Sequence, residues 1–402
     1  MRRVAITGLG CVSALGCGVA AFWEGLLAGR SGQRRITLFD PQALSVPVAA
    51  EVPGYDPQQH FSAKKLDLLD RFTQFALLAA GEALRDAGLE PPGGDPSRAG
   101  VALGTGAGGA LTQDDGYLRL YGRRASRVPP FTIPRLMYNA AASQISMDYG
   151  LTGPVLVFST ACAAAAHALG EAAEIIRSGR ADWMLAGGSD APICYGLMKC
   201  WEAMRVLAPV CRPFSADRQG LVIGEGAGVL VLEEWEAARR RGARIHAELA
   251  GYGATADAGH ITQPGLEAPV AAIRAALRQA GLAPEEVAYV NAHGTATRLN
   301  DSTETEILKR AFGPHARRLA VSSTKSMHGH AMGATGALEL IAAVLALGRG
   351  VVPPTANYTT PDPECDLDCV PNAPRPLQVR AALSNSFAFG GLNAVLAVKH
   401  PS

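Results

Sequence analysis

Strand-like and helix-like segments alternate along most of the chain, and this alternation limits the folds that it can adopt. Short apolar runs such as Val4–Gly10 and Val287–Asn291 are separated by longer segments rich in helix-forming residues, such as Pro269–Ala280. Strands that alternate with helices are typical of parallel β-sheets covered by helices on the outside. The sequence therefore predicts an α/β protein. Because residues 1–240 and 241–402 both show the alternation, an internal duplication is a hypothesis that the sequence permits.

Composition narrows the class of protein further. The 402 residues are 48% hydrophobic and 18% charged, which suits a well-packed globular protein, and a formal net charge of +1 favours neither nucleic acid nor a membrane surface. The start of the chain lacks the apolar core of a signal peptide, and no window of ~18 residues is both apolar and uncharged. The eight cysteines form no CxxC pair and no zinc-spaced cluster with histidine. We therefore expect a reduced, cytoplasmic enzyme that binds neither nucleic acid nor membrane.

One cysteine stands where a strand is expected to give way to a helix. Pro154–Phe158 has strand character, and Ala163–Ile176 is dominated by helix formers, with Cys162 between the two. At a helix N-terminus the free backbone N–H groups and the positive end of the dipole stabilise a thiolate, so Cys162 is a candidate nucleophile. A buried cysteine that packs as a small hydrophobic side chain is the alternative.

Two histidines occupy comparable positions in the second half of the chain. His293 and a following Gly-Thr turn come directly after one predicted strand, and His330 follows the next one, with Lys325 nearby. Open α/β sheets bind their ligands beyond the carboxyl ends of the strands. Each histidine taken alone is equally well explained as a structural residue. Together with Cys162 they favour nucleophilic catalysis assisted by histidine.

Other motifs suggest competing chemistries, and each lacks a necessary part. Gly8-Leu-Gly10 begins a dinucleotide-binding pattern, but residue 13 is serine and no clear acidic residue follows at the distance that binds a ribose. Gly104–Gly109 lacks the Lys-Ser/Thr pair of a phosphate-binding loop. His328 and His330 have no clustered partners that would complete a metal site. We therefore expect no metal.

Six motifs, taken in order, resemble one enzyme family. They match β-ketoacyl-acyl-carrier-protein synthases of the ketosynthase II type, in the thiolase superfamily, and the similarity spans essentially the whole chain. The motifs are RRVAITGLGCVSALG at 2–16, STACAAAAHALG at 159–170, RPFSADRQGLVIGEGAGVLVLE at 212–233, NAHGTATRLND at 291–301, SSTKSMHGHAMGATGALE at 322–339 and SNSFAFGGLN at 384–393. The set is specific, because the cysteine and both histidines lie inside matching motifs.

The resemblance implies a fold and an assembly. Family members have a thiolase-like, duplicated α/β fold of five layers, αβαβα, so residues 1–240 would form the half that carries the nucleophilic cysteine. Residues 241–402 would form the half that carries both catalytic histidines. Family members are commonly dimers with a substrate tunnel that reaches the dimer interface. We expect a homodimer, or a heterodimer with a partner that resembles a chain-length factor.

The resemblance also implies a mechanism, a decarboxylating Claisen condensation. Cys162, with its pKa lowered at the helix N-terminus, would take an acyl group from acyl carrier protein. The backbone N–H groups of Cys162 and Phe389 would form the oxyanion hole. His293 and His330 would then assist the loss of carbon dioxide from malonyl-acyl-carrier protein. The resulting carbanion would attack the acyl group and give β-ketoacyl-acyl-carrier protein.

Further residues match supporting positions of the family. Lys325 would hold the catalytic geometry by pairing with Glu304 and Glu339, because a buried lysine needs an acidic partner. Thr295 and Thr297 match residues that hydrogen-bond the pantetheine arm of the substrate. No metal and no cofactor of the protein's own is expected, since the phosphopantetheine arrives on the carrier protein.

Several positions depart from the family pattern and leave the pathway open. Phe389 matches a gate on the acyl pocket, whereas Ala107 stands where a bulkier aliphatic residue often closes that pocket. The segments around residues 194–212 and 263–268 are shorter than in typical fatty-acid enzymes. Unusual residues occupy four further family positions, namely Gln219, His328, Ala388 and Leu392. Fatty-acid elongation and a specialised polyketide or polyene pathway both stay open, and the shorter segments and Ala107 favour the specialised one.

Two alternatives use the same residues differently. A thiolase-like enzyme or acyltransferase would use Cys162 without decarboxylation, but thiolases usually carry a second catalytic cysteine, whereas this chain offers two histidines. A carrier-binding partner subunit would be inactive, and the intact set of Cys162, His293 and His330 argues against that role.

Overall fold

Most strands of the protein belong to one sheet that consists of two units. The computed structural model describes residues 2–89 and 94–401, and eleven of the strands in these residues form the sheet. A short antiparallel contact joins the two units, because β1 (Val4–Ser13) and β9 (Ala247–Ala256) pair at two register positions. Five strands lie on each side of this contact, and the short strand β2 pairs with β1.

The two five-stranded units have the same strand order and the same strand directions. Numbered along the chain within each unit, the strands lie in the order 3-2-4-5-1, where strands 2, 3 and 4 are parallel and strand 5 is antiparallel to its neighbours. The first unit contains β1, β5 (Ala99–Gly104), β6 (Val155–Phe158), β7 (Trp183–Asp190) and β8 (Gly226–Glu234). The second contains β9, β10 (Tyr289–Asn291), β11 (Ala320–Ser322), β14 (Ala381–Ala388) and β15 (Leu392–Lys399). The repetition supports an internal duplication, while the division into 1–240 and 241–402 stays a prediction.

Both units are mixed sheets, which corrects the expectation of parallel sheets. Parallel strands need crossover connections, and helices link β5, β6 and β7 in that way. Strands that follow one another through a short turn run antiparallel instead, as β14 and β15 do on either side of Phe389–Gly391. The apolar runs Ala381–Ser384 and Ala394–Val398 around SNSFAFGGLN predict a strand pair from the sequence alone. The structure confirms this pair, and both strands are longer than predicted.

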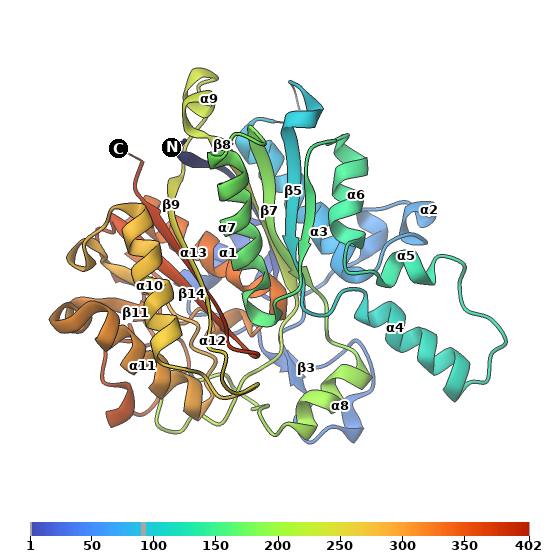
Figure 1. Cartoon of the computed structure of the whole chain (residues 1–402). Coiled ribbons are helices and arrows are strands. Elements are labelled where there is room, and N and C mark those ends of the chain that lie inside the picture. The colour runs from blue at the N-terminus through green and yellow to red at the C-terminus, as the bar shows by residue number, and fades with distance from the viewer. Residues whose placement is uncertain (1, 90–93, 402) are drawn as a thin grey trace.

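Helices cover the outer faces of the two units and fill the space between them (Figure 1). The central layer consists of α7 (Ala164–Arg177) and α13 (Thr335–Arg349), which pack on strands of both units. The outer layers are α3 (Arg71–Ala87) with α6 (Ala140–Tyr149) on the first unit, and α10 (Glu267–Ala280) with α11 (Arg298–Phe312) on the second. These five layers confirm the predicted αβαβα fold.

The central layer is apolar on nearly every side because sheets cover it from two directions. Within the described residues, the segment Met332–Arg349, which contains α13, is the one helix long and apolar enough to cross a membrane, and 83% of it is buried inside the protein. Such all-round apolarity is expected of a helix enclosed by a core. The hydrophobicity of α13 is therefore explained by its place between the two units.

Two glycines of β1 allow α3 to pack directly on the first unit. An added Cβ would lie 2.1 Å from the carbonyl oxygen of Ala83 at Gly8, and 2.0 Å from that of Ala79 at Gly10. Only residues without a side chain permit this approach of helix to strand. The GxG pattern at the start of the chain is thus explained by strand–helix packing.

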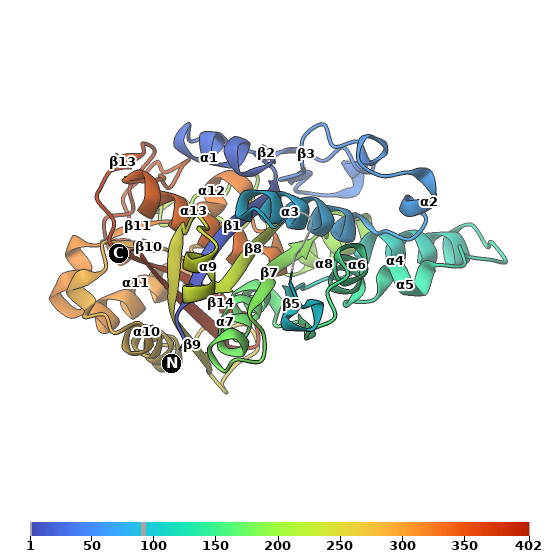
Figure 2. The same ribbon diagram turned by 90° about the horizontal axis from the view of Figure 1, so that it is seen from above.

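The helices differ from the prediction in two respects. The amphipathic pattern of Leu66–Ala87 predicts one long helix, but the structure divides it at Asp70. The carboxylate of Asp70 accepts the backbone N–H of Phe72 (3.2 Å) and so caps the N-terminus of α3. Three α-helices of at least five residues form in segments for which the sequence predicts none, namely α4 (Ala110–Tyr117), α5 (Thr132–Leu136) and α8 (Tyr195–Ala203). Of these, α4 and α5 project from the first unit away from the second (Figure 2).

The remaining elements are short or peripheral. They are α1 (Val19–Leu27), α2 (Ala63–Leu66), α9 (Trp235–Arg240), α12 (Lys325–His328), β2 (Gly16–Cys17), β3 (Arg34–Arg35), β4 (Val48–Ala49), β12 (Val351–Val352) and β13 (Arg375–Pro376).

Candidate active site

Cys162 lies where strand β6 gives way to helix α7, as the sequence predicts. A short 3-10 turn, Ala161–Ala163, precedes α7 and carries the buried Cys162. Ala161 has a φ of 49°, a left-handed conformation that is unfavourable for a residue with a Cβ and that makes the turn sharp. The turn places the sulfur beside a cavity at the N-terminal end of α7.

His330 contacts the sulfur directly. Its Nε2 atom lies 2.9 Å from Sγ of Cys162, and its Nδ1 atom lies 3.0 Å from the hydroxyl oxygen of Thr335. The backbone N–H of His330 donates to the carbonyl of Val222 (2.7 Å), which fixes the loop between α12 and α13. The imidazole is therefore held at both nitrogens, and a proton can pass between it and the thiol.

His293 completes a group of three side chains at the same cavity. It follows β10, and its ring lies edge-on to that of His330, with the ring centroids 5.8 Å apart. The backbone N–H groups of His293 and Gly294 donate to the carboxylate of Glu304 (2.8 and 2.7 Å), which holds the turn after the strand. The structure thus brings together the three residues that the sequence places in two different halves.

Lys325 determines which nitrogen of His293 carries the proton. Its ammonium lies 3.4 Å from Nδ1 of His293 and donates to the carbonyl of the same residue. An ammonium group only donates hydrogen bonds, so Nδ1 acts as the acceptor and the proton resides on Nε2. Lys325 also forms an ion pair with Glu339, and both side chains are fully buried.

The ion pair corrects one detail of the prediction. Lys325 pairs with Glu339, but Glu304 instead accepts the backbone N–H groups described above and a hydrogen bond from Asn385 (3.2 Å). The reason is local, because Glu304 lies on α11 beneath the turn that carries His293. The two acids therefore fix different parts of the same histidine.

Burial determines the protonation states in the group. The pKa values of His293 and His330 are lowered well below the usual value, first by burial and then by the charge of Lys325. Both imidazoles are therefore neutral at pH 7. Burial likewise raises the pKa of the Cys162 thiol to about 11, although Lys325 and two backbone N–H groups lower it. The predicted lowering at the helix N-terminus is present, but it is outweighed by burial, so the resting sulfur is a thiol.

Two backbone N–H groups converge on the sulfur. Those of Cys162 and Phe389 both lower the pKa of the thiol. Phe389 lies in the turn between β14 and β15, where Gly390 and Gly391 take positive φ values of 85° and 70°. Donors in this position would also meet the oxygen of a carbonyl group bonded to the sulfur.

The cavity beside the sulfur, here called the site cavity, collects most of the predicted residues. Cys162, His293 and His330 line it together with two hydroxyl groups, those of Thr295 and Thr297, whose oxygen atoms lie 3.0 Å apart. The rest of its wall is largely apolar and includes Trp201, Ile261, Leu299 and Phe389. Lys325, Glu304 and Glu339 lie behind His293, outside the wall.

Ala107 lies in a different cavity, here called the Ala107 cavity, of about 490 Å³. Its wall is mostly apolar and includes Ala107, Leu197, Cys200, Trp201, Met204 and Met332. The small side chain of Ala107 thus borders a mostly apolar space, while the use of this space for acyl chains stays a prediction.

Asp190 is a buried residue of the site that the sequence analysis misses. Its carboxylate accepts hydrogen bonds from the hydroxyl of Thr105 (2.7 Å) and from the backbone N–H groups of Gly106 (2.7 Å), Ala107 (2.9 Å) and Gly333 (2.6 Å). It therefore ties the loop that carries Ala107 to the loop that follows His330. The sequence does carry a signal for Asp190, because this polar residue stands at the end of strand β7, just as polar residues follow β10 and β11.

The donor atoms of Cys162, His293 and His330 all lie within 4.8 Å of one another, a spacing that a metal ion can also use. The ammonium of Lys325 beside His293 opposes any additional positive charge there. The geometry therefore favours proton transfer and hydrogen bonding over metal ligation.

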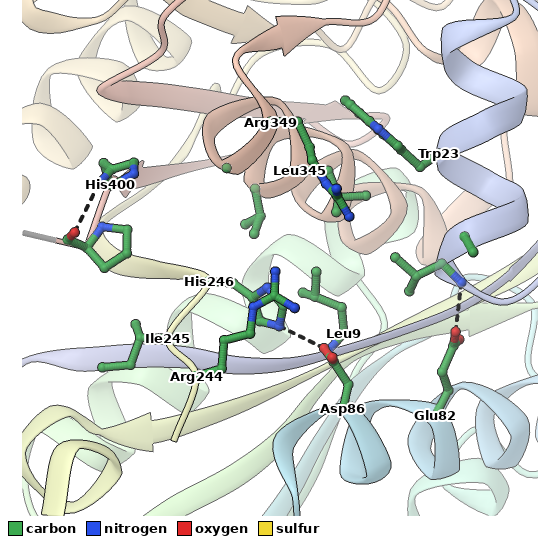
Figure 3. Close-up of a pocket in the computed structure, with 15 residues that line it drawn as sticks. Leu9, Trp23, Glu82, Asp86, Arg244, Ile245, His246, Leu345, Arg349 and His400 are labelled. Atoms are coloured by element: carbon green, nitrogen blue, oxygen red, sulfur yellow. Dashed lines mark hydrogen bonds and ion pairs between the residues drawn. The ribbon is translucent and has the colours of Figure 1, made fainter. Parts of the chain in front are cut away.

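A further cavity, of about 390 Å³, lies at another place in the fold, between α1, α3 and the end of α13 (Figure 3). Its charged groups largely bind the protein itself. Asp86 contacts His246 (2.8 Å), and Glu82 accepts the backbone N–H of Val19 (2.8 Å). None of the predicted catalytic residues lines it.

Comparison with known proteins agrees with this geometry. Residues 1–238 match the family model for the N-terminal domain of β-ketoacyl synthases, and residues 246–359 match that for the C-terminal domain. The chain belongs to the β-ketoacyl synthase family. The resemblance inferred from the six motifs is therefore confirmed.

Relatives and solved structures cover the whole chain. Nodulation protein E of Rhizobium sp. (strain N33) is 50% identical over 399 residues, 99% of each chain. The 3-oxoacyl-[acyl-carrier-protein] synthase 2 of Staphylococcus aureus (strain N315) is 44% identical over 406 residues, 99% of this chain and 98% of the relative. The ishigamide ketosynthase/chain length factor superposes with a TM-score of 0.94 at 39% identity, and the type II ketosynthase of AntDE:AntF with 0.92 at 36%, each over 100% of both chains.

Proposed function

We propose that this β-ketoacyl synthase condenses an acyl group held on Cys162 with malonyl-acyl-carrier protein and releases carbon dioxide. The observation that carries the proposal is the convergence of one thiol, two neutral imidazoles and two backbone N–H groups on a single cavity. Each group has a role in the two half-reactions.

The first half-reaction loads the acyl group. His330 accepts the proton of the thiol across the 2.9 Å contact, and the sulfur attacks the thioester carbonyl of acyl-carrier protein. The oxygen becomes an oxyanion within reach of the N–H groups of Cys162 and Phe389. The carbon–sulfur bond to the carrier then breaks, and the carrier leaves as a thiol with the proton from His330.

The second half-reaction extends the chain. Neutral His293, protonated on Nε2, donates a hydrogen bond to the thioester oxygen of malonyl-carrier protein, where charge develops as carbon dioxide departs. Neutral His330 donates a second hydrogen bond in the tautomer that carries its proton on Nε2, in which Nδ1 accepts from the hydroxyl of Thr335. The enolate carbon attacks the acyl carbonyl, the bond to Sγ breaks, and the released thiolate of Cys162 takes up one proton from solvent. The product is a β-ketoacyl-carrier protein that is longer by the two carbons retained from malonate.

The carrier protein and its phosphopantetheine arm complete this proposal. Thr295 and Thr297 offer paired hydroxyl groups on the wall of the site cavity, where the amide-rich arm would lie. The enzyme itself would then need no metal and no organic cofactor. A known structure of a related ketosynthase in complex with an acyl-carrier protein supports this partner.

We also propose that the protein is a dimer in the cytoplasm, with itself or with a chain-length-factor-like partner. Strand β6 pairs with β5 and lies at the end of the strand order, and its Val155 and Leu156 are 37% and 39% exposed. An unpaired apolar sheet edge is a natural interface, since pairing with a second chain would satisfy it. A related structure, that of a ketosynthase/chain length factor, supports the heterodimer as the alternative to the homodimer.

The pathway is either fatty-acid elongation or a specialised polyketide or polyene route, and the small Ala107 side chain at a roomy cavity favours the specialised one. The relatives agree with both, since they include a 3-oxoacyl-carrier-protein synthase and a nodulation protein.

The direct test mixes the enzyme with acyl-carrier protein and malonyl-carrier protein and measures carbon dioxide and the mass of the carrier-bound product. We expect a β-ketoacyl product and one carbon dioxide per turnover. Acyl transfer without carbon dioxide would instead indicate the thiolase-like or acyltransferase alternative. An enzyme that binds carrier protein but forms no acyl-enzyme would indicate a partner subunit.

A further inference from the structure

The site cavity and the Ala107 cavity are neighbours that share one wall. Among the residues that the structure describes, Trp201 is the only one that lines both cavities. Cys162 and both histidines lie on one side of it, and Ala107 and Met332 lie on the other. The indole therefore separates the reacting sulfur from the larger apolar space.

Phe389 supports the indole on the side of the site cavity. The two rings are stacked, with their centroids 6.2 Å apart and an angle of 27° between their planes. The backbone N–H of Phe389 also lowers the pKa of the Cys162 thiol. Rotation of the indole of Trp201 therefore breaks its stacking on the ring of Phe389.

Helix α8 holds Trp201 in place from the outside. The neighbouring residue Glu202 accepts a hydrogen bond from the hydroxyl of Ser45 (2.7 Å), and Lys199 donates to the carbonyl of Ala43 (3.0 Å). The indole packs against the same buried apolar cluster as Met332. The backbone at Trp201 is therefore anchored, and a passage between the cavities requires a change of its side chain.

We propose that Trp201 is a specificity-determining residue that divides the acyl-binding space in two. This inference rests on the proposed function, because it concerns the acyl group carried by Cys162. Short acyl chains remain in the site cavity, whereas long acyl chains enter the Ala107 cavity after the indole has rotated away from Phe389. The wall discriminates between substrates by chain length, and it leaves the chemistry at the thioester unchanged.

Separating the indole of Trp201 from the ring of Phe389 costs little free energy. Aromatic pairs contribute only a small free energy beyond their buried area, so rotation of the indole is compatible with turnover. Removal of the indole should therefore change the preference for long over short chains on the order of tenfold.

The test measures acylation of Cys162 by carrier protein loaded with a butyryl or a palmitoyl group, followed by intact mass of the enzyme at short times. In Trp201→Ala, we expect the palmitoyl rate to rise relative to the butyryl rate on the order of tenfold. Trp201→Leu keeps apolar packing on α8 and should give a smaller change in the same direction, which covers the case that the alanine variant does not fold.

Trp235→Phe is the matched control, because Trp235 is buried on α9 and lines neither cavity. It should leave the palmitoyl-to-butyryl ratio unchanged. An unchanged ratio in both Trp201 variants, with acylation intact, would overturn the inference and leave the proposed function standing. Failure of the unaltered enzyme to acylate Cys162 with either chain would overturn the proposed function, and this inference with it.

Discussion

The site cavity and the Ala107 cavity lie side by side and are built on different principles. At the site cavity, each reactive group is buried and is fixed by directional polar contacts, such as those of His330 with Thr335 and of Lys325 with Glu339. The Ala107 cavity is bounded mainly by apolar side chains, and two of them, Tyr138 and Met204, are 49% and 43% exposed.

The difference shows which part of the molecule can vary. Removing one partner of a buried polar group leaves the other without its hydrogen bond or counter-charge and lowers the stability of the protein. The residues around the site cavity therefore tolerate little change. An apolar wall can change its volume and keep its chemistry, so the range of substrates can change independently. Asp190 connects the two parts, because it binds the Ala107 loop and Gly333 at once.

The largest effect should come from the sulfur itself. Cys162→Ala removes the nucleophile, and we expect condensation to fall on the order of 10⁴-fold or more, with no acyl-enzyme in the mass spectrum. Cys17→Ser is the control, because Cys17 is exposed on the short strand β2 and lies outside both cavities. A Cys162→Ala enzyme that still formed an acyl-enzyme would show that another residue carries the acyl group.

Removing the buried ammonium of Lys325 should lower both the stability of the protein and the rate of decarboxylation. Lys325→Met leaves Glu339 without its partner, so we expect a loss of about 3–5 kcal/mol in the free energy of unfolding and a fall in malonyl decarboxylation on the order of 10²-fold. Unfolding in urea and release of carbon dioxide measure the two effects.

The double variant Lys325→Met with Glu339→Leu removes both charges and should recover most of the stability without recovering decarboxylation. Recovery of decarboxylation in the double variant would mean that Lys325 acts through stability alone, and not through the tautomer of His293.

A smaller and selective effect should follow from filling the apolar space. Ala107→Phe reduces the Ala107 cavity, and we expect acylation by long chains to fall about tenfold while acylation by short chains changes little. Product length, read from the mass of the carrier-bound product, measures the change. An equal fall for short and long chains would mean that the cavity supports the site and does not hold the chain.

The smallest effect concerns pH. The pKa values of His293 and His330 lie well below the usual value, so both imidazoles stay neutral as the pH falls from 7.5 to 6, and decarboxylation should change by less than about twofold. A histidine with an ordinary pKa would lose about three quarters of its neutral form by pH 6. A fall of that size, with the thermal melting unchanged, would contradict the burial assigned to these rings.

Local patterns foretold the position of the reactive residues well. Cys162 at a strand–helix junction, and His293 and His330 after successive strands, follow from propensities and from the way in which sheets present their carboxyl ends. The sequence did not foretell the raised pKa of Cys162, because burial is a property of the assembled layers. A helix N-terminus can be seen in the sequence, but the desolvation that opposes it cannot.

The helix boundaries and helices that the sequence did not predict also depend on contacts formed only in the folded protein. The side chain of Asp70 divides a long helical pattern because it caps α3 and also binds Thr112 (2.6 Å), a contact between residues far apart in the chain. Helix α8 has nine residues and buries Met198 alone, so little in the sequence distinguishes it from a loop or points to the role of Trp201. The mixed sheet follows from short connections between strands, which propensities do not specify.

One comparison of rates tests the central claim most directly, namely that acylation of Cys162 and decarboxylation assisted by His293 are separable half-reactions in one cavity. In His293→Ala, acylation of Cys162 by acyl-carrier protein and release of carbon dioxide from malonyl-carrier protein are measured on the same preparation. We predict that acylation stays within about threefold of the unaltered enzyme, while carbon dioxide release falls on the order of 10²-fold or more. Equal losses in both rates, or an unchanged release of carbon dioxide, would contradict the account.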